Sequence, residues 1–112
     1  MDIFYHVTTA EAWKLIQKEG FRGSDRVCGY GVYLFDDLEL AVEYAQDVEA
    51  FGDGAQAVIL KVKSDDLISC EEALGGFPER EGDQAYYEHV FLYPMADEPV
   101  WRPQYVQKLK AW

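Results

Sequence analysis

The run Gly29-Tyr30-Gly31-Val32-Tyr33-Leu34-Phe35 carries the clearest structural signal in this sequence. Its last four residues are apolar strand formers, so we expect a short strand that begins just after a glycine-containing loop. Asp36 or Asp37 can then cap a helix, because apolar residues recur with helical spacing directly after them. Tyr44 lies on that helix, eleven positions after Tyr33. Two aromatic side chains are therefore expected to flank one region of the fold.

Further helices and strands are expected on both sides of this run. Upstream, Thr8 or Thr9 can cap a helix that Gly20 ends. A polar stretch over 65–83 indicates mostly loop. Further strands are predicted from apolar or alternating runs at Ile3–Val7, Ala57–Val62, Tyr86–Tyr93 and Val100–Leu109. Strands dominate and the two helices come early, so we expect an α+β fold, and 112 residues indicate a single domain over 1–112.

The chain is acidic, with 21 Asp and Glu residues against 10 Lys and Arg and a net charge of −11. The acids are spread along the whole sequence, which indicates an acidic surface rather than an acidic tail. Direct binding to DNA or RNA phosphates needs Lys and Arg and is disfavoured. A basic protein partner fits this surface, and so does mimicry of a nucleic acid. The plainer explanation is a self-repelling surface that keeps the protein soluble.

The spacing of the cysteines and the lack of long apolar segments indicate in which cellular compartment the protein is expected. Cys28 and Cys70 have neither a CxxC spacing nor a metal-ligand spacing, so we expect no metal site and two inert, reduced, apolar side chains. The first residues lack the features of a signal peptide, and no segment reaches the length of a membrane span. A cytoplasmic protein is the resulting expectation.

Several short motifs follow one another in a distinctive order. They are Tyr5-His6-Val7-Thr8, the run that ends in Tyr33-Leu34-Phe35, Tyr44, Glu88-His89-Val90-Phe91-Leu92-Tyr93, and Arg102-Pro103-Gln104-Tyr105-Val106. Together they resemble the ADP-ribosyltransferase fold, in the branch of poly(ADP-ribose) polymerases and diphtheria-like toxins. That branch is marked by a His, Tyr, Glu triad on three separate strands. The resemblance covers nearly the whole chain.

The resemblance implies two small antiparallel sheets that hold NAD in a cleft, with two helices in the N-terminal half. Glu88 would stabilise the oxocarbenium-like charge that develops on the ribose, and would help to deprotonate the acceptor. The rings of Tyr33 and Tyr44 would sandwich the nicotinamide by offset stacking. His6 would hydrogen-bond the adenosine ribose. These residues are the expected catalytic and NAD-binding set.

Further contacts to NAD are implied for four residues. The backbone of Val7 would pair with the nicotinamide carboxamide, and the hydroxyl of Thr8 would contact a ribose. The diphosphate needs a local base, and Arg22 and Arg26 are nearest in the expected loop. The chain also departs from the family pattern, because Val7 replaces a glycine and Ala41 replaces a serine that often binds the carboxamide.

The function implied is transfer of one ADP-ribose unit from NAD to a macromolecule, with a basic protein as the expected acceptor. Arginine is a less favoured acceptor, because Tyr86 stands where arginine-modifying relatives carry Glu or Gln. The loop over 71–84 would recognise the target. A small acidic form suits a phage or bacterial effector, such as a toxin or an anti-CRISPR enzyme, that acts in the cytoplasm of a host cell.

Two other functions remain open. The same fold could hydrolyse NAD as a glycohydrolase, or it could be a non-catalytic acidic mimic of a nucleic acid that binds a basic protein. Each site residue also has a plainer explanation: His6 as a structural histidine, Tyr33 and Tyr44 as core aromatics, and Glu88 as a side chain that faces solvent.

Overall fold

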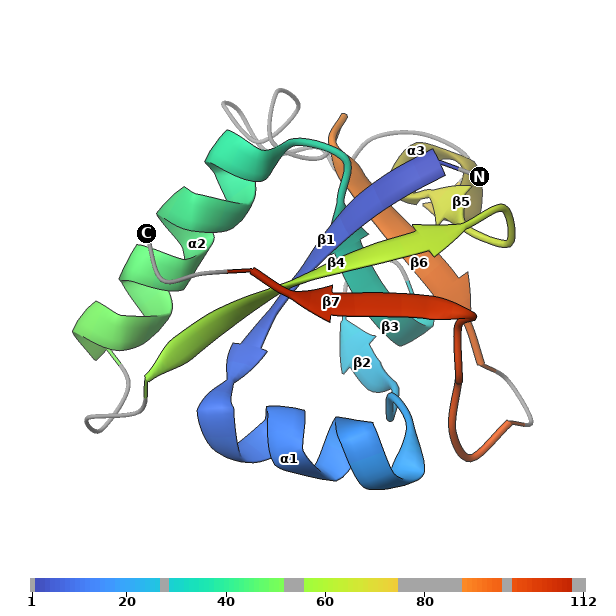
Figure 1. The fold of residues 1–112 in the computed structure, drawn as a ribbon. Helices are drawn as coiled ribbons and strands as arrows, with labels where there is room; N and C mark the ends of the chain where they lie inside the picture. The colour runs from blue at the N-terminus through green and yellow to red at the C-terminus, as the bar shows by residue number, and fades with distance from the viewer. Residues whose placement is uncertain (1, 27–28, 52–55, 75–87, 96–97, 110–112) are drawn as a thin grey trace.

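The structure is a computed structural model that describes residues 2–26, 29–51, 56–74, 88–95 and 98–109. It is an α+β fold in which three helices pack on one seven-stranded sheet (Figure 1). The helices are α1 (Ala10–Glu19), α2 (Leu38–Phe51) and α3 (Cys70–Leu74). The strands are β1 (Asp2–Thr9), β2 (Ser24–Arg26), β3 (Gly29–Phe35), β4 (Ala57–Ser64), β5 (Ile68–Ser69), β6 (Val90–Pro94) and β7 (Tyr105–Lys108).

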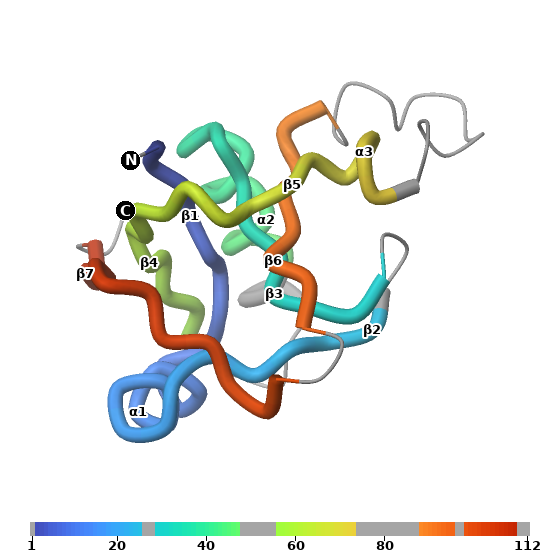
Figure 2. The backbone as a smooth tube through the Cα atoms, turned by 90° about the vertical axis from the view of Figure 1, so that its right-hand side faces the viewer, coloured from blue at the N-terminus to red at the C-terminus, as the bar shows by residue number. Residues whose placement is uncertain are grey.

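The sheet consists of two well-paired halves with a narrow junction between them. Its strand order is β5-β6-β3-β1-β4-β7, and β2 pairs with β3 outside this path. Strand β1 pairs with β4 along its whole length, from Asp2↔Ser64 to Thr9↔Ala57, whereas it pairs with β3 only at Tyr5↔Phe35. Figure 2 shows β7, β4 and β1 on one side and β3, β6 and β5 on the other. The two separate sheets that we expected are thus one antiparallel sheet with a weak centre.

Helix α1 begins and ends where the sequence predicts. Thr9 is its N-cap, and its Oγ1 accepts a hydrogen bond from the backbone N–H of Ala12 at 3.1 Å. Gly20 ends the helix with a φ of 94°, which favours glycine, and its N–H bonds the carbonyl of Ile16. Both capping predictions are confirmed.

Helix α2 is capped by Asp37, the second of the two expected residues. The Oδ1 atom of Asp37 accepts from the N–H groups of Glu39 at 2.8 Å and Leu40 at 3.3 Å. Ala41 and Ala45 are fully buried, which lets this helix pack closely on the sheet. None of the helices in the described part of the chain combines the length and the apolar content that a membrane span requires.

The alternating strands supply an apolar core on each side of the sheet. On the side of α1, Val58, Leu60 and Val62 of β4 pack with Phe21 and Trp101. On the side of α2, the intervening β4 residues Ala57 and Ile59 pack with Phe35, Val90, Leu92 and the helix alanines. This period of two is the pattern of a strand buried on both faces.

The loop expected before Val32 is instead a hairpin. Residues 24–26 pair with 29–31, so β3 begins at Gly29 rather than at Val32. Glycine is suited to Gly31, because a Cβ there would lie 2.6 Å from Cδ1 of Leu92 and closer still to the carbonyl oxygen of Tyr93. The glycines that indicated a loop therefore allow two strands to approach closely.

The polar stretch after β4 is also more ordered than expected. It contains β5 and the short helix α3, although residues 75–87 lie outside the described part. Cys70 is fully buried and disulfide-bonded, so the expectation of a reduced side chain is wrong for this residue. Cys28 lies outside the described residues.

Candidate functional site

His6 connects the two halves of the sheet. Its Nδ1 lies 2.7 Å from the backbone carbonyl oxygen of Tyr33, 27 positions away in the sequence. Since a carbonyl only accepts hydrogen bonds, this Nδ1 carries the proton. The ring also meets Phe21 edge-on, with centroids 5.1 Å apart. A hydrogen bond on one side and an aromatic contact on the other fix the orientation of the imidazole.

Val7 and Thr8 follow His6 at the point where β1 leaves β3. Both remain paired to β4, Val7 with Ile59 and Thr8 with Val58. Among the described residues, β1 and β3 share only the pair at Tyr5, so neither residue is paired to β3. The backbone of β1 is thus separated from β3 where the carboxamide contact of Val7 was expected.

Tyr33 and Tyr44 lie on the same side of the sheet. Both rings pack against the core on the side of α2, Tyr33 from β3 and Tyr44 from the helix. The hydroxyl of Tyr33 donates to the carbonyl of Gly29 at 2.5 Å, and the ring of Tyr44 meets Phe35 at 5.7 Å with the planes tilted by 53°. His6, by contrast, contacts Phe21 on the side of α1. The structure therefore joins His6 to the backbone of Tyr33, while the two side chains face opposite cores.

Glu88 lies in a turn rather than on the expected strand. Strand β6 begins at Val90, and the carboxylate of Glu88 is exposed in the turn before it. The pair Phe35↔Val90 places this turn beside the end of β3. A strand rises about 3.3 Å per residue, so the turn begins about 7 Å along the sheet from the level of Tyr33, which pairs with Leu92. No described hydrogen bond or ion pair joins Glu88 to His6, Tyr33 or Tyr44.

A contact not foreseen from the sequence fastens the turn that carries Glu88. His89 Nδ1 lies 2.7 Å from Oδ1 of Asp36, and the N–H of Asp36 donates to the carbonyl of His89 at 3.0 Å. Asp36 follows β3 directly, so this double contact fixes the turn to the strand of Tyr33. Each side chain alone is an ordinary polar residue, and only the pairing of β3 with β6 brings them together.

Of the two arginines expected to bind the diphosphate, the structure describes the side chain of Arg22 but not that of Arg26. Arg22 is exposed and forms an ion pair with Glu19 at 3.0 Å, so a phosphate would compete with that carboxylate. Arg26 ends β2, and its side chain lies outside the described residues. The acceptor loop over 71–84 is described only as far as residue 74.

Described residues line pockets at two places near the C-terminal segment. One, of about 270 Å³, lies between α1 and the segment 101–106. The other, of about 560 Å³, is lined largely by polar and charged residues between the end of β4 and the segment 98–104. None of His6, Tyr33, Tyr44 and Glu88 lines either one.

Tyr93 contributes to the polar pocket and has a perturbed hydroxyl. It stacks on Trp101 with centroids 4.3 Å apart, and it donates a hydrogen bond to Oε2 of Glu98 at 2.9 Å. Burial raises the pKa of Tyr93 above its ordinary 10.0, and the hydrogen bond and negative charge of Glu98 raise it further, as does the charge of Asp66.

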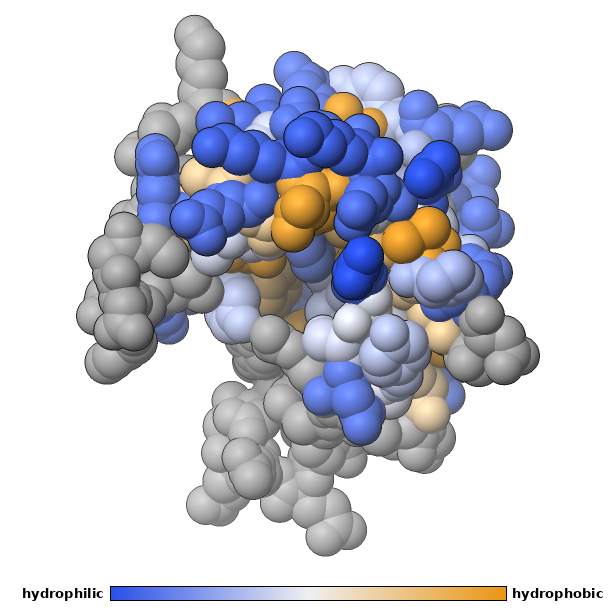
Figure 3. Space-filling model, turned by 90° about the horizontal axis from the view of Figure 1, so that it is seen from below, coloured by the Kyte–Doolittle hydropathy of each residue, from blue (hydrophilic) through white to orange (hydrophobic). Residues whose placement is uncertain are grey.

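The visible surface around α1 is predominantly hydrophilic (Figure 3). Apolar residues appear there in separate small patches rather than one large area. The exposed large hydrophobic side chains lie on different elements: Ile3 on β1, Leu15 on α1, Tyr30 on β3 and Leu38 on α2. Single exposed residues of this kind are ordinary and do not indicate a partner.

We also looked for groups of metal-binding side chains and for similarity to other proteins. Within the described part of the chain, no three His, Cys, Asp or Glu side chains are grouped so that they could hold a metal ion. No protein-family model, no curated protein and no solved structure matches this sequence.

Proposed function

We propose that this chain is an NAD-dependent mono-ADP-ribosyltransferase. The observation that supports this most is the 2.7 Å contact between His6 Nδ1 and the carbonyl oxygen of Tyr33. It joins two of the three motifs of the expected triad, next to the position where β1 and β3 stop pairing. A dinucleotide seated there would span the junction, with its adenosine ribose near His6 and its nicotinamide near Tyr33.

The proposed reaction breaks the glycosidic bond between C1′ of the ribose and the nicotinamide nitrogen. The bonding electrons go to that nitrogen and neutralise the pyridinium charge. Positive charge develops on the ribose until the acceptor forms a bond to C1′ and loses a proton. A carboxylate that is held close to the ribose stabilises this charge, and Glu88 is the residue that we assign to this role.

The other proposed contacts to NAD come from both faces of the sheet. The rings of Tyr33 and Tyr44 would bind nicotinamide on the side of α2, where both already pack. The unpaired side of β1 at Val7 would contact the carboxamide. Thr8 would contact a ribose. Arg22 would leave its ion pair with Glu19 and bind the diphosphate instead. Ala41 is fully buried and supplies no hydroxyl, so nicotinamide binding would depend mostly on stacking.

The acceptor is proposed to be a basic protein. Glu88 is exposed in its turn, so a macromolecule can approach it. A net charge of −11 attracts a basic surface over a longer range than any single contact. An effector such as a toxin or an anti-CRISPR enzyme, acting in a host cytoplasm, is the setting that we propose.

A second candidate is NAD hydrolysis. It is favoured by the same exposure of Glu88, because water reaches that carboxylate as readily as a protein does. Incubation with NAD labelled in the adenylate part separates the two activities. Label transferred to a protein band in a lysate supports the transferase, whereas free ADP-ribose without a labelled band supports the glycohydrolase.

Glu88→Gln tests the assignment itself. This isosteric change removes the charge, so nicotinamide release should fall by at least about 100-fold, as when one preorganised electrostatic group is lost. Glu43→Gln is the matched control, since Glu43 is an exposed acid on α2, and it should release nicotinamide at the wild-type rate. Failure of the wild-type protein to turn NAD over, together with tight binding to a basic protein, would instead favour the acidic mimic.

A further inference from the structure

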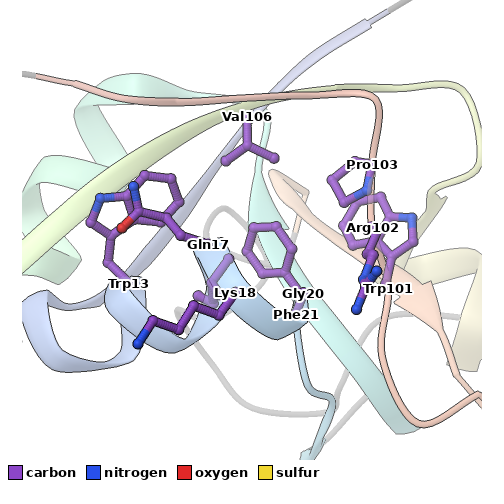
Figure 4. A pocket seen from close by; sticks show the side chains of 10 residues that line it. Trp13, Gln17, Lys18, Gly20, Phe21, Trp101, Arg102, Pro103 and Val106 are labelled. Atoms are coloured by element: carbon purple, nitrogen blue, oxygen red, sulfur yellow. The ribbon is translucent and has the colours of Figure 1, made fainter.

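The pocket between α1 and the segment 101–106 is built by residues far apart in the sequence (Figure 4). Phe21 and Trp101 form an antiparallel bridge at its base, and each donates its N–H to the carbonyl oxygen of the other at 2.8 Å. Trp13 from α1 and Val106 from β7 complete an apolar interior. Both walls are thus held by backbone pairing and by the core on the side of α1.

The charged residues around this pocket are all cations. Lys18 and Arg102 line it, and no Asp or Glu side chain does. This is unexpected in a chain with 21 acids and 10 bases. Glu19, which follows Lys18 in the sequence, directs its carboxylate to Arg22, and its backbone carbonyl accepts from Nε of Arg102 at 3.3 Å. Arg102 is therefore fixed at the rim without its charge being neutralised by Glu19.

We infer that this pocket binds a small amphipathic carboxylate, with an aromatic or branched aliphatic body inside and its carboxylate on Arg102. Lys18 lies at the other end of the pocket and adds positive potential there (Figure 4). The volume of about 270 Å³ is just below the range of about 300–1,000 Å³ that ligand pockets usually occupy, which selects a compact ligand. An apolar body gains by leaving water, and a carboxylate on a guanidinium or ammonium forms a charge-assisted hydrogen bond. This site is separate from the proposed NAD residues and does not depend on the proposed function.

Three probes of equal shape test the inference: 4-phenylbutyrate, 4-phenylbutan-1-ol and 4-phenylbutylamine. Each is titrated into the protein while the indole N–H signals of the tryptophans are followed by NMR. A hydrogen bond to a charged group contributes about 1.5–3 kcal/mol, so the carboxylate should bind at least about tenfold more tightly than the alcohol. The amine should bind most weakly of the three.

Variants locate the site. Lys18→Gln combined with Arg102→Gln should reduce carboxylate binding to the level of the alcohol. Lys14→Gln combined with Lys108→Gln removes the same charge from exposed positions on α1 and β7 that do not line the pocket, and it should leave binding unchanged. Lys18→Glu alone, on the exposed surface of α1, replaces one of the two rim cations with an acid that offsets Arg102, so it should remove most of the preference for the carboxylate over the amine. This single surface change keeps the test decisive if the double variant is poorly folded.

Four results would overturn the inference. They are equal affinity for the three probes, no binding up to about 10 mM, a control double variant as defective as the rim variant, and competitive displacement of 4-phenylbutyrate by NAD. The last result would make the pocket part of the NAD site. A protein that shows no NAD turnover but binds the carboxylate with the expected selectivity would contradict the proposed function alone.

Discussion

Gly31→Ala is expected to destabilise the protein more than any other single methyl addition in β3. The new Cβ would lie 2.6 Å from Cδ1 of Leu92 and nearer still to the carbonyl oxygen of Tyr93. The leucine methyl can rotate away, but the carbonyl belongs to β6 and is fixed by the pairs Gly31↔Pro94 and Val32↔Tyr93. The strands must therefore separate locally for alanine to fit.

Two effects of Gly31→Ala lower the free energy of unfolding. Overpacking in a dense interior costs about 1–3 kcal/mol, and the loss of one or two ladder hydrogen bonds adds about 1 kcal/mol each. A total of about 2–5 kcal/mol is a large share of the roughly 5–15 kcal/mol that holds a domain folded. At about 4 °C per kcal/mol, the Tm should fall by about 8–20 °C.

Thermal and urea unfolding followed by tryptophan fluorescence measure this loss, with Gly29→Ala as the control. A Cβ at Gly29 would meet nothing closer than 4.0 Å, so only its φ of 111° is unfavourable, at about 1–2 kcal/mol. The close approach of β3 and β6 is refuted if Gly31→Ala is no more destabilising than Gly29→Ala.

Three smaller predictions concern other contacts. Asp37→Ala should lower the free energy of unfolding by about 1 kcal/mol through loss of the α2 cap, and Asp37→Asn should restore most of it in urea titrations. His6→Ala should cost about 2 kcal/mol, since it loses a hydrogen bond and its edge contact with Phe21; a cost near zero would show that the contact to β3 contributes nothing. The raised pKa of Tyr93 favours the protonated hydroxyl in the folded state, so its contribution to stability is complete below pH 10.0 and is lost as the pH rises through the folded-state pKa. Glu98→Gln should lower that pKa, as measured by tyrosinate absorbance with Tyr93→Phe subtracted, and an unchanged titration would contradict the role of the carboxylate.

Local sequence signals were sufficient to predict the ends of α1 and the start of α2. Thr9, Gly20 and Asp37 act through bonds within four residues, so their roles can be predicted without knowledge of the fold. Helix α3 also has a local signal that the sequence analysis missed. Ser69 is followed by Glu72 three positions later, the pattern of a capping box, and the Ser69 hydroxyl accepts from the N–H of Glu72 at 3.1 Å.

Features set by pairing between distant segments could not be predicted in this way. Gly31 looks like a turn residue until Tyr93 is known to lie against it. The turn at Glu88 and its attachment through His89 and Asp36 depend on the register of β3 with β6. The same holds for the cationic pocket, because Lys18 and Arg102 come from opposite ends of the sequence.

The bridge between Phe21 and Trp101 also constrains how the protein is made. The segment that supplies Arg102 is synthesised 83 residues after Glu19. Trp101 follows Phe21 by 80 positions, so at about 5–20 residues per second Phe21 waits about 4–16 s for its partner to be translated. During that interval the growing chain has α1 but not the segment 101–106 across the pocket from it, so Trp13, Ile16 and Phe21 lack part of their apolar surroundings. Chains interrupted before Trp101 therefore expose more apolar surface than the finished protein.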